Sequence, residues 1–468
     1  MDPQRGLCPG GLGLAQAEVK GNLNPWNGQK VLVVGMGRSG VAAAEWLLGQ
    51  KAEVTMFDES KEPAVVGVGD RMQARGAKVM VGEMEVVSGG FDRAILSPGI
   101  ASDRPIVRAL LALKVPILSE LELGWLACLC PLVAVTGTNG KSTTTELITQ
   151  ILQAAGKRAV ACGNFGLPLC EVAALSRDYD WAVAEVSSFQ LEGIETFRPK
   201  IAVYLNLTPD HLDRYATMAE YGAAKARIFE NQKADDVAVV CRGAVLPKSL
   251  ARTLAFTAEA SGAEYTLDQG WLCAHGEKVM RQDTTMLKGK HNAENLLAAL
   301  AVADVMKVPR EVVKKVFASY KALPHRCELV ALRAGVRWIN DSKATNLDAM
   351  ERAIEGMEGP VLLIAGGKDK GFDVSTSRVV LEGKVRAVFL LGEMAEKMEK
   401  AWNRSVPCRR VRDLGEAVQR AAEMAREGES VLLSPGCSSY DMFKNFEERG
   451  EKYRQCVLAL PQEKKNHE

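Results

Sequence analysis

The sequence predicts an α/β protein of about three domains, in which mostly parallel sheets are covered by helices on both faces. Short runs rich in Val, Ile and Leu alternate with helix-compatible runs along most of the chain, and this alternation is typical of a parallel sheet. Two glycine-rich turns each follow such a strand-like run and precede a helix-like run. A chain of 468 residues is also too long for a single hydrophobic core.

Composition argues against several classes of partner. The formal net charge is +1, so no strong field favours nucleic acid or an anionic membrane. The longest uncharged apolar run, 123–135, is too short to span a bilayer and contains Pro131. The N-terminus lacks the apolar core of a signal peptide, and the eleven cysteines show no metal-type spacing. We therefore expect a cytoplasmic protein with free thiols and without nucleic-acid or membrane partners.

The first predicted domain contains a glycine-rich turn after its first strand. Residues 1–28 are rich in Gly, Pro and Asn, and we expect them to form a loose extension. A strand at 30–34 leads into Gly35-Met36-Gly37-Arg38-Ser39-Gly40, a helix at 41–48 and a strand at 53–57 that ends in Asp58. This spacing is typical of nucleotide binding in a Rossmann-like domain. The alternative is that the glycines only allow close packing of the helix on the strand. A further strand at 93–96 leads to a turn at 97–100 on the same sheet edge.

The central predicted domain contains the most specific pattern in the chain. An apolar run at 133–135 is followed by Thr136-Gly137-Thr138-Asn139-Gly140-Lys141-Ser142-Thr143 and a helix at 145–155. The backbone N–H groups of such a turn bind a polyphosphate, while Lys141 reaches the outer phosphates and the Ser142 hydroxyl binds Mg²⁺. The P-loop pattern is incomplete, because Val135 stands where a glycine is usual. The alternative is a plain strand-to-helix turn with a solvent-facing lysine.

Polar residues follow several further strands of this central sheet, which we expect at 158–161, 181–186, 201–207 and 236–240. They lie at 163–166, at Glu185 with Ser187 and Ser188, and at 208–213. Ligands of parallel sheets bind beyond the carboxyl ends of the strands. Glu185 interrupts an apolar strand, and a metal ion would offset the cost of burying its carboxylate. His211 is a candidate metal ligand or proton carrier, although a lone histidine is more often structural.

The rest of the central domain gives weaker signals. Lys225 lies in a helix-like run and by itself indicates a surface residue. Residues 252–290 predict a small excursion of short strands. Asn292 and Asn295 share one face of the helix that runs to Met306. They could read an adenine edge or, alternatively, cap the helix N-terminus.

The third predicted domain begins near Leu323 and is again Rossmann-like. Strands at 338–341, 361–365, 385–391 and 431–433 alternate with helices. Three of them end in polar loops at 340–346, 366–371 and 434–440. The charged residues 461–468 are expected to fray.

Taken together, residues 136–143, the turn at 35–40, the loop at 340–346 and residues 434–446 resemble the Mur ligase family from about residue 28 to residue 460. The resemblance implies a Rossmann-like UDP-substrate domain at 29–119, a P-loop ATP-binding domain at 120–322 and a Rossmann-like amino-acid-binding domain at 323–468. It implies a cytoplasmic ligase that adds D-glutamate to UDP-N-acetylmuramoyl-L-alanine through an acyl phosphate, with release of ADP and phosphate. We expect a monomer whose partners are small-molecule substrates.

The resemblance also assigns roles to residues. Those matching the UDP-substrate site are Gly37, Arg38, Ser39, Asp58, Gly99, Asn164, Ser187 and His211. Those matching the ATP site are Thr136, Gly137, Thr138, Asn139, Gly140, Lys141, Ser142, Thr143, Asn292, Asn295, Arg326 and Asp341. Those matching the D-glutamate site are Lys343, Thr345, Lys370, Ser439, Tyr440 and Phe446. Arg38-Ser39 departs from the Leu-Thr that is frequent in the family.

The implied chemistry uses ATP and two Mg²⁺ ions. The expected metal ligands are Ser142, Glu185, His211 and Lys225, the last as an N-carboxylated lysine, whose anionic oxygens suit a hard cation. The catalytic set is Lys141, Glu185, His211, Lys225, Asp341 and Lys343. Either His211 or Asp341 could assist deprotonation of the incoming amine, and the sequence does not choose between them.

Three alternatives stay open at this point. A folylpolyglutamate synthase or another Mur ligase shares the loop at 136–143, although residues 341–346 argue against both. An NAD(P)-dependent oxidoreductase could be built on the turn at 35–40, but it leaves the P-loop, Glu185 and His211 without a role. A P-loop switch protein would hydrolyse ATP to change shape.

Overall fold

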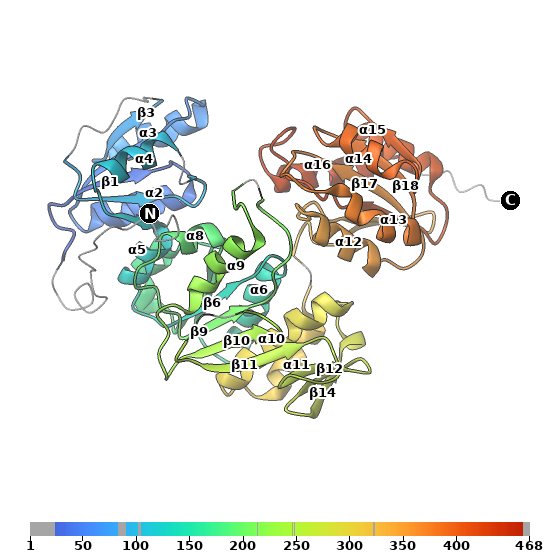
Figure 1. The fold of residues 1–468 in the computed structure, drawn as a ribbon, viewed down its shortest axis with the longest axis horizontal. Coiled ribbons are helices and arrows are strands. Elements are labelled where there is room, and N and C mark those ends of the chain that lie inside the picture. The colour runs from blue at the N-terminus through green and yellow to red at the C-terminus, as the bar shows by residue number, and fades with distance from the viewer. Residues whose placement is uncertain are drawn as a thin grey trace. The chain divides into compact units, whose positions relative to one another are not determined.

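The computed structural model describes residues 24–82, 90–101, 104–212, 214–245, 247, 249–321 and 323–461. Most of the predicted N-terminal extension, Asp213 and residues 462–468 lie outside these ranges. The described chain forms three sheets (Figure 1) and separates into two compact units. The first unit holds the described residues up to Leu207 with Ala219–Thr284 and Ala293–Ala318. The second holds Thr208–Met218, Thr285–Asn292 and the described residues from Ser319 onward. The predicted domain boundaries stay predictions.

The first sheet is parallel and has the order β3-β2-β1-β4-β5. Its strands are β1 (Lys30–Val34), β2 (Glu53–Asp58), β3 (Lys78–Val81), β4 (Arg93–Leu96) and β5 (Ile117–Ser119). Its helices are α2 (Arg38–Gly49), α3 (Pro63–Ala74) and α4 (Pro105–Ala112). Proline at the first helical position begins α3 and α4, because its missing N–H costs nothing there.

The second sheet has nine strands in the order β14-β13-β12-β11-β10-β9-β6-β8-β7. The parallel part comprises β6 (Leu132–Thr136), β7 (Ala159–Gly163), β8 (Trp181–Glu185), β9 (Ile201–Tyr204), β10 (Val237–Cys241), β11 (Arg252–Thr257) and β12 (Tyr265–Asp268). Two short strands, β13 (Trp271–Ala274) and β14 (Glu277–Arg281), extend it in antiparallel pairing. The predicted β excursion therefore continues the central sheet. The helices are α6 (Lys141–Ala154), α7 (Leu169–Ala174), α8 (Ser188–Glu192), α9 (Met218–Ala226), α10 (Lys290–Val305) and α11 (Arg310–Ser319).

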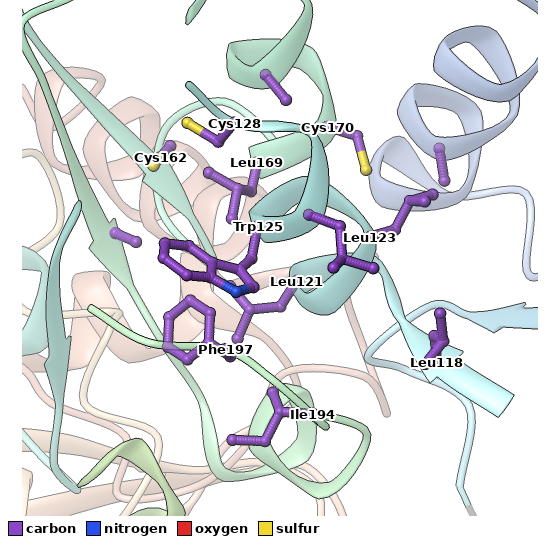
Figure 2. Close-up of a cluster of buried hydrophobic side chains, with 14 of the residues drawn as sticks. Leu118, Leu121, Leu123, Trp125, Cys128, Cys162, Leu169, Cys170, Ile194 and Phe197 are labelled. Carbon is purple, nitrogen blue, oxygen red and sulfur yellow. The ribbon is translucent and has the colours of Figure 1, made fainter. Parts of the chain in front are cut away.

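Helix α5 (Glu120–Ala127) is buried on all sides and links the first two sheets through one continuous hydrophobic core. Figure 2 shows Trp125 of α5 beside Phe197, with Leu169 close by. The Glu122 carboxylate accepts hydrogen bonds from three successive backbone N–H groups at 195–197. Glu120 accepts one from the Cys170 N–H at 2.8 Å, and burial raises its pKa to about 7. This helix therefore holds carboxylates inside the core at a cost in desolvation.

The third sheet has the order β15-β16-β20-β17-β18-β19 and is parallel except at β15. Its strands are β15 (Glu328–Arg333), β16 (Val336–Asn340), β17 (Val361–Gly366), β18 (Val385–Leu391), β19 (Cys408–Arg410) and β20 (Ser430–Leu433). Alternate residues of β17 enter two separate hydrophobic clusters. One cluster packs α12 (Leu347–Gly356), α13 (Arg378–Lys384) and α14 (Ala395–Trp402), and the other packs α15 (Leu414–Met424) and α16 (Phe446–Leu458). Helices thus cover both faces (Figure 1).

The predicted α/β class is confirmed, and most predicted strands are found within two or three residues of their expected ends. The ten described cysteines are free thiols, and six of them are buried. Within the described ranges, no helix is both long enough and apolar enough to cross a bilayer.

Candidate active site

The loop between β6 and α6 has the backbone conformation that a phosphate-binding loop needs. Gly137 has φ +149° and Gly140 has φ +85°, a region that side-chain-bearing residues rarely adopt. A Cβ atom on Gly140 would also lie 2.1 Å from Oδ1 of Asn295. The loop ends at the N-terminus of α6, where backbone N–H groups and the helix dipole favour an anion.

Asn206, which follows β9, holds this loop from the neighbouring strand end. Its Oδ1 accepts from the N–H groups of Thr138 at 3.1 Å and Asn139 at 2.9 Å. Its Nδ2 donates to the Asn139 carbonyl at 3.1 Å. The backbone carbonyl of Asn206 also accepts from the Thr138 N–H. Sequence reasoning missed this residue, and the only available signal was a polar side chain at the end of a buried strand.

Two lysine ammonium groups converge on the Gly137 carbonyl oxygen. Lys141 Nζ donates to it at 2.9 Å and to the Thr138 carbonyl at 2.7 Å. Lys225 Nζ donates to the same Gly137 oxygen at 2.8 Å and lies 4.6 Å from the centroid of the Tyr221 ring. Lys225 is only 1% exposed, so its interpretation as a surface residue is wrong. An anion bound at this loop would therefore meet two cations.

The side chains of Ser142 and Glu185 meet beside the loop. Glu185 ends β8, the strand next to β6, and is buried. Ser142 Oγ donates to its Oε2 at 2.5 Å, and Asn164 Nδ2 donates to its Oε1 at 2.6 Å. Two hard oxygen donors at one buried point fit Mg²⁺. The described residues contain no cluster of three or more His, Cys, Asp and Glu that could hold a metal ion, and the roles of His211 and Lys225 as further ligands stay predictions.

Further predicted residues of the first unit lie at β6, α6, α8 and α10. Asn295 is buried in α10, and its Oδ1 accepts from Thr144 Oγ1 at 3.3 Å. Thr136 donates through Oγ1 to the Val186 carbonyl, and Thr143 is buried in the first turn of α6. Ser187 is the N-cap of α8 and forms a capping box with Gln190. A direct role for Ser187 in binding a substrate stays a prediction.

The first sheet carries a separate pocket of about 360 Å³ at the carboxyl ends of β1 and β2. It is lined by Val34, Gly35, Phe57, Asp58, Glu59, Ser60, Ile100, Arg104 and Ile106. Asp58 accepts from the backbone N–H groups of Met36 at 2.7 Å and Ser60 at 2.9 Å. Its carboxylate therefore shapes the glycine-rich turn as well as lining the pocket. A Cβ on Gly40 would lie 1.8 Å from the Gly35 carbonyl oxygen, so close packing is part of what these glycines do.

The remaining residues predicted for this site surround the turn. Gly37 is the N-cap of α2, and Ser39 lies in the first turn of that helix. Gly99 is exposed in the turn after β4. Arg38 is exposed and donates through Nη2 to the Gly166 carbonyl at 3.0 Å, which joins this turn to the loop that carries Asn164.

In the second unit, Asp341 follows β16 and is buried. Its Oδ2 accepts from Ser434 Oγ at 2.8 Å and its Oδ1 from the Cys327 N–H at 3.1 Å. Burial raises the pKa of Asp341 to about 6, although these hydrogen bonds and the charge of Arg326 oppose the rise. Asn292, near the start of α10, donates to the Lys288 carbonyl at 2.8 Å.

The predicted D-glutamate residues lie at three loops of the second unit. Lys343 Nζ lies 4.3 Å from the centroid of the Phe446 ring, and Thr345 is half-buried two residues further on. Lys370 follows β17 and pairs with Asp210. Ser439 is buried after β20, whereas Tyr440 beside it is 69% exposed.

Two charged residues near these loops were given no individual role from the sequence, although Asp210 lies in the predicted polar segment 208–213. Arg449 of α16 is buried and donates to the Ser342 carbonyl at 2.7 Å and to the Cys437 carbonyl at 3.1 Å, which braces the loop at 340–346. Burial lowers its pKa to about 10. Asp210 lies beside His211, whose Nε2 is 3.6 Å from Asp210 Oδ2. Burial opposes ionisation of Asp210, but Lys370 and His211 outweigh it and lower its pKa.

Comparison with known proteins gives consistent matches along the chain. Three family models match: the MurD-like N-terminal domain of Mur ligases at residues 29–119, the Mur ligase middle domain at 135–303 and the Mur ligase glutamate ligase domain at 325–437. A UDP-N-acetylmuramoylalanine–D-glutamate ligase from Syntrophotalea carbinolica is 40% identical over 445 residues, which cover 93% of this chain and 98% of the relative. One from Pelotomaculum thermopropionicum is 41% identical over 453 residues, which cover 94% and 99%.

Solved structures show the same fold at lower identity. MurF ligase from Thermotoga maritima, solved in complex with ADP, has a TM-score of 0.60 and 17% identity, and the match covers 87% of this chain and 95% of that one. UDP-N-acetylmuramate-alanine ligase MurC from the same organism has a TM-score of 0.58 and 17% identity, with 92% and 99% covered. These solved structures share the α/β fold of this chain. On the identity and coverage of its relatives, the chain belongs to the Mur ligase family of enzymes.

Proposed function

We propose that this ligase joins D-glutamate to UDP-N-acetylmuramoyl-L-alanine in peptidoglycan precursor synthesis, with ATP converted to ADP and phosphate. The names of the relatives that match over nearly the whole chain support this substrate pair. The observation that carries the chemistry is the pairing of Ser142 Oγ with Glu185 Oε2 at 2.5 Å, beside a glycine loop that accepts hydrogen bonds from the Lys141 ammonium. This arrangement suits the phosphates of ATP and the accompanying cation.

The reaction needs activation of a carboxylate, because oxide is a poor leaving group. In the proposed first step, the alanine carboxylate attacks the γ-phosphorus of ATP, so that an acyl phosphate forms and ADP leaves. The N–H groups of the loop and the ammonium of Lys141 stabilise the charge on the transferring phosphoryl group. Bound Mg²⁺, held by Ser142 and Glu185, would supply further charge neutralisation.

Lys225 is the proposed site of a second ion, as its carbamate. The ammonium must lose a proton before Nζ can attack CO₂, and a second proton leaves as the carbamate forms. One N–H then remains on the nitrogen, so the hydrogen bond to the Gly137 carbonyl can persist while the new carboxylate becomes a ligand. The exchange of a cation for an anion also removes one of the two positive charges at that carbonyl. Carbon-13 NMR of the protein in labelled bicarbonate tests this directly, and a Lys225→Gln variant should lack the carbamate signal.

In the proposed second step, the amine of D-glutamate attacks the acyl carbon, and the tetrahedral intermediate releases phosphate. Lys343 and Lys370 are the candidates for pairing with its two carboxylates, with Thr345, Ser439, Tyr440 and Phe446 around them. Asp341 is buried and both of its carboxylate oxygens accept hydrogen bonds, so it is poorly placed to take a proton. The side chain of His211 is 29% exposed, which favours His211 for assisting deprotonation.

The domain roles follow from these assignments. We assign residues 29–119 to the UDP part of the substrate, residues 120–322 to ATP and residues 323–468 to the amino acid. Of the predicted residues, Asp58 lines the 360 Å³ pocket, and Gly37, Arg38 and Ser39 follow β1 at the same edge of the sheet, which supports the first assignment.

The deciding experiment measures ADP and phosphate release from the full chain with ATP, Mg²⁺ and UDP-N-acetylmuramoyl-L-alanine, with and without D-glutamate. We expect release that requires both substrates, and L-glutamate or other amino acids should not replace D-glutamate. ATP hydrolysis that is indifferent to both substrates would instead indicate a P-loop switch. Saturable binding of NADH at the turn at 35–40 would indicate an oxidoreductase, and either result would overturn the proposal.

A further inference from the structure

Asp210 is buried and accepts hydrogen bonds from two side chains of the second unit. It lies in the segment Thr208–Met218, which leaves the central sheet after β9, and it is 4% exposed. Lys370 Nζ donates to its Oδ1 at 3.1 Å, and Asn346 Nδ2 donates to its Oδ2 at 2.9 Å. A single carboxylate therefore contacts two loops that follow different strands of the third sheet.

These two loops carry the candidate D-glutamate residues. Lys370 follows β17 and its side chain is 13% exposed. Asn346 ends the loop that contains Lys343 and Thr345, and its Oδ1 caps α12 by accepting from the Ala349 N–H at 2.8 Å. The position of Lys370 relative to that loop thus depends on Asp210.

We propose that Asp210 is a positioning residue that holds the ammonium of Lys370 ready for a carboxylate of the amino-acid substrate. The inference rests on the proposed function, in which Lys370 binds D-glutamate. An ammonium has three N–H donors, so one bond to Asp210 leaves two for a substrate carboxylate.

Two physical costs explain why such a residue is needed. A lysine side chain loses considerable rotamer freedom when it is ordered, on the order of 2 kcal/mol. An ammonium that is mostly removed from water is also costly unless it is paired. Asp210 offsets both costs before the substrate arrives, so that binding energy from D-glutamate is not used to order Lys370.

Asp210 acts through Lys370 and does not itself face the reacting atoms in this assignment. Both of its carboxylate oxygens accept hydrogen bonds from protein side chains, and the residue is almost fully buried. The neighbouring carboxylate of Asp369 provides a contrast, because it pairs with Lys397 at 2.9 Å. The Asp369–Lys397 pair is more exposed than the Asp210–Lys370 pair, and its lysine is not a candidate for binding the substrate.

A double-mutant cycle tests the inference with the full chain. Asp210→Asn removes the charge and should raise the KM for D-glutamate about 10- to 100-fold, as expected for loss of one hydrogen bond between charged groups. The KM values for ATP and for the UDP-linked substrate should not change. Lys370→Met should raise the KM for D-glutamate at least as much, and the double variant should match Lys370→Met. Asp369→Asn is the control and should behave as wild type.

Three results would overturn the inference. The first is an unchanged KM for D-glutamate in Asp210→Asn, and the second is an equal rise in Asp369→Asn. The third is a further rise when Asp210→Asn is added to Lys370→Met, because that would show an action independent of Lys370. Asp210→Ser gives the same test if the asparagine amide opposes Asn346 and disturbs folding, which circular dichroism would reveal. Failure of the proposed function is distinguishable, because wild type would then release no phosphate in response to D-glutamate.

Discussion

Replacement of Asn206 by alanine should weaken ATP binding without unfolding the protein. The side chain of Asn206 forms two hydrogen bonds with Asn139, one with its N–H and one with its carbonyl. The Thr138 N–H donates both to this side chain and to the backbone carbonyl of Asn206. Only the two bonds to Asn139 are wholly lost in the variant. Each net hydrogen bond stabilises by about 0.5–1.5 kcal/mol, so the phosphate-binding shape of the loop should lose about 1–3 kcal/mol.

That loss lowers the population of the binding-competent loop, and the apparent affinity falls by the same factor. We expect the KM for ATP to rise about 5- to 150-fold, whereas the KM for D-glutamate stays constant. Steady-state kinetics with ATP varied, supported by direct titration with a non-hydrolysable analogue, gives both values. Asn206→Asp keeps the acceptor oxygen but places a negatively charged oxygen opposite the Asn139 carbonyl, so it should also raise the KM for ATP. An Asn206→Ala enzyme with wild-type KM for ATP would refute the reasoning.

Three further predictions concern single residues. Glu185→Gln keeps the size of a buried side chain but removes its charge. The kcat should therefore fall at least about 100-fold, while the melting temperature does not fall by more than a few degrees. Near-normal turnover in saturating Mg²⁺ would contradict this prediction. Lys343→Ala should lower kcat/KM for D-glutamate with the fold unchanged, and an unaltered kcat/KM would remove it from the site. Burial raises the pKa of Glu120 from 4.5 to about 7, so the stability associated with its protonated form is present below pH 4.5 and is lost as pH rises through 7. Glu120→Gln should therefore match wild type in thermal melts near pH 4.5 and exceed it at pH 8, and a constant difference between the two pH values would argue against this.

Much of the fold was predictable because buried parallel strands are short apolar runs that can be recognised in the sequence. The strand at 93–96 and the strand at 385–391 were predicted with the same ends that β4 and β18 have. The glycine loop was predictable because Gly137 and Gly140 adopt positive φ angles that favour glycine, and this requirement depends only on the local sequence. Strand ends next to polar residues were predicted less accurately. For example, β9 ends at Tyr204, whereas the predicted strand continued to residue 207.

Contacts between distant segments could not be predicted in the same way. Lys225 lies in a helix whose sequence suggests exposure, and its burial depends on the Gly137 carbonyl and the Tyr221 ring. The sequence gives Asn206 and Asp210 no distinguishing feature, because their hydrogen-bond partners lie in distant segments of the chain. The resemblance to a family suggested a role for Lys225, but it gave no reason for the burial.

The shared contact at the Gly137 oxygen has a thermodynamic consequence. The nitrogens of Lys141 and Lys225 each lie within 2.9 Å of that atom, so they are at most about 5.7 Å apart and repel each other by about 3 kcal/mol at an effective dielectric of about 20. In the proposed mechanism, carbamate formation at Lys225 would remove one of these positive charges and bound nucleotide would neutralise the other, so both would relieve that repulsion. Two ligands that relieve the same charge repulsion are reciprocally linked. The bicarbonate concentration should therefore change the affinity for nucleotide, and the nucleotide concentration should change the extent of carbamate formation.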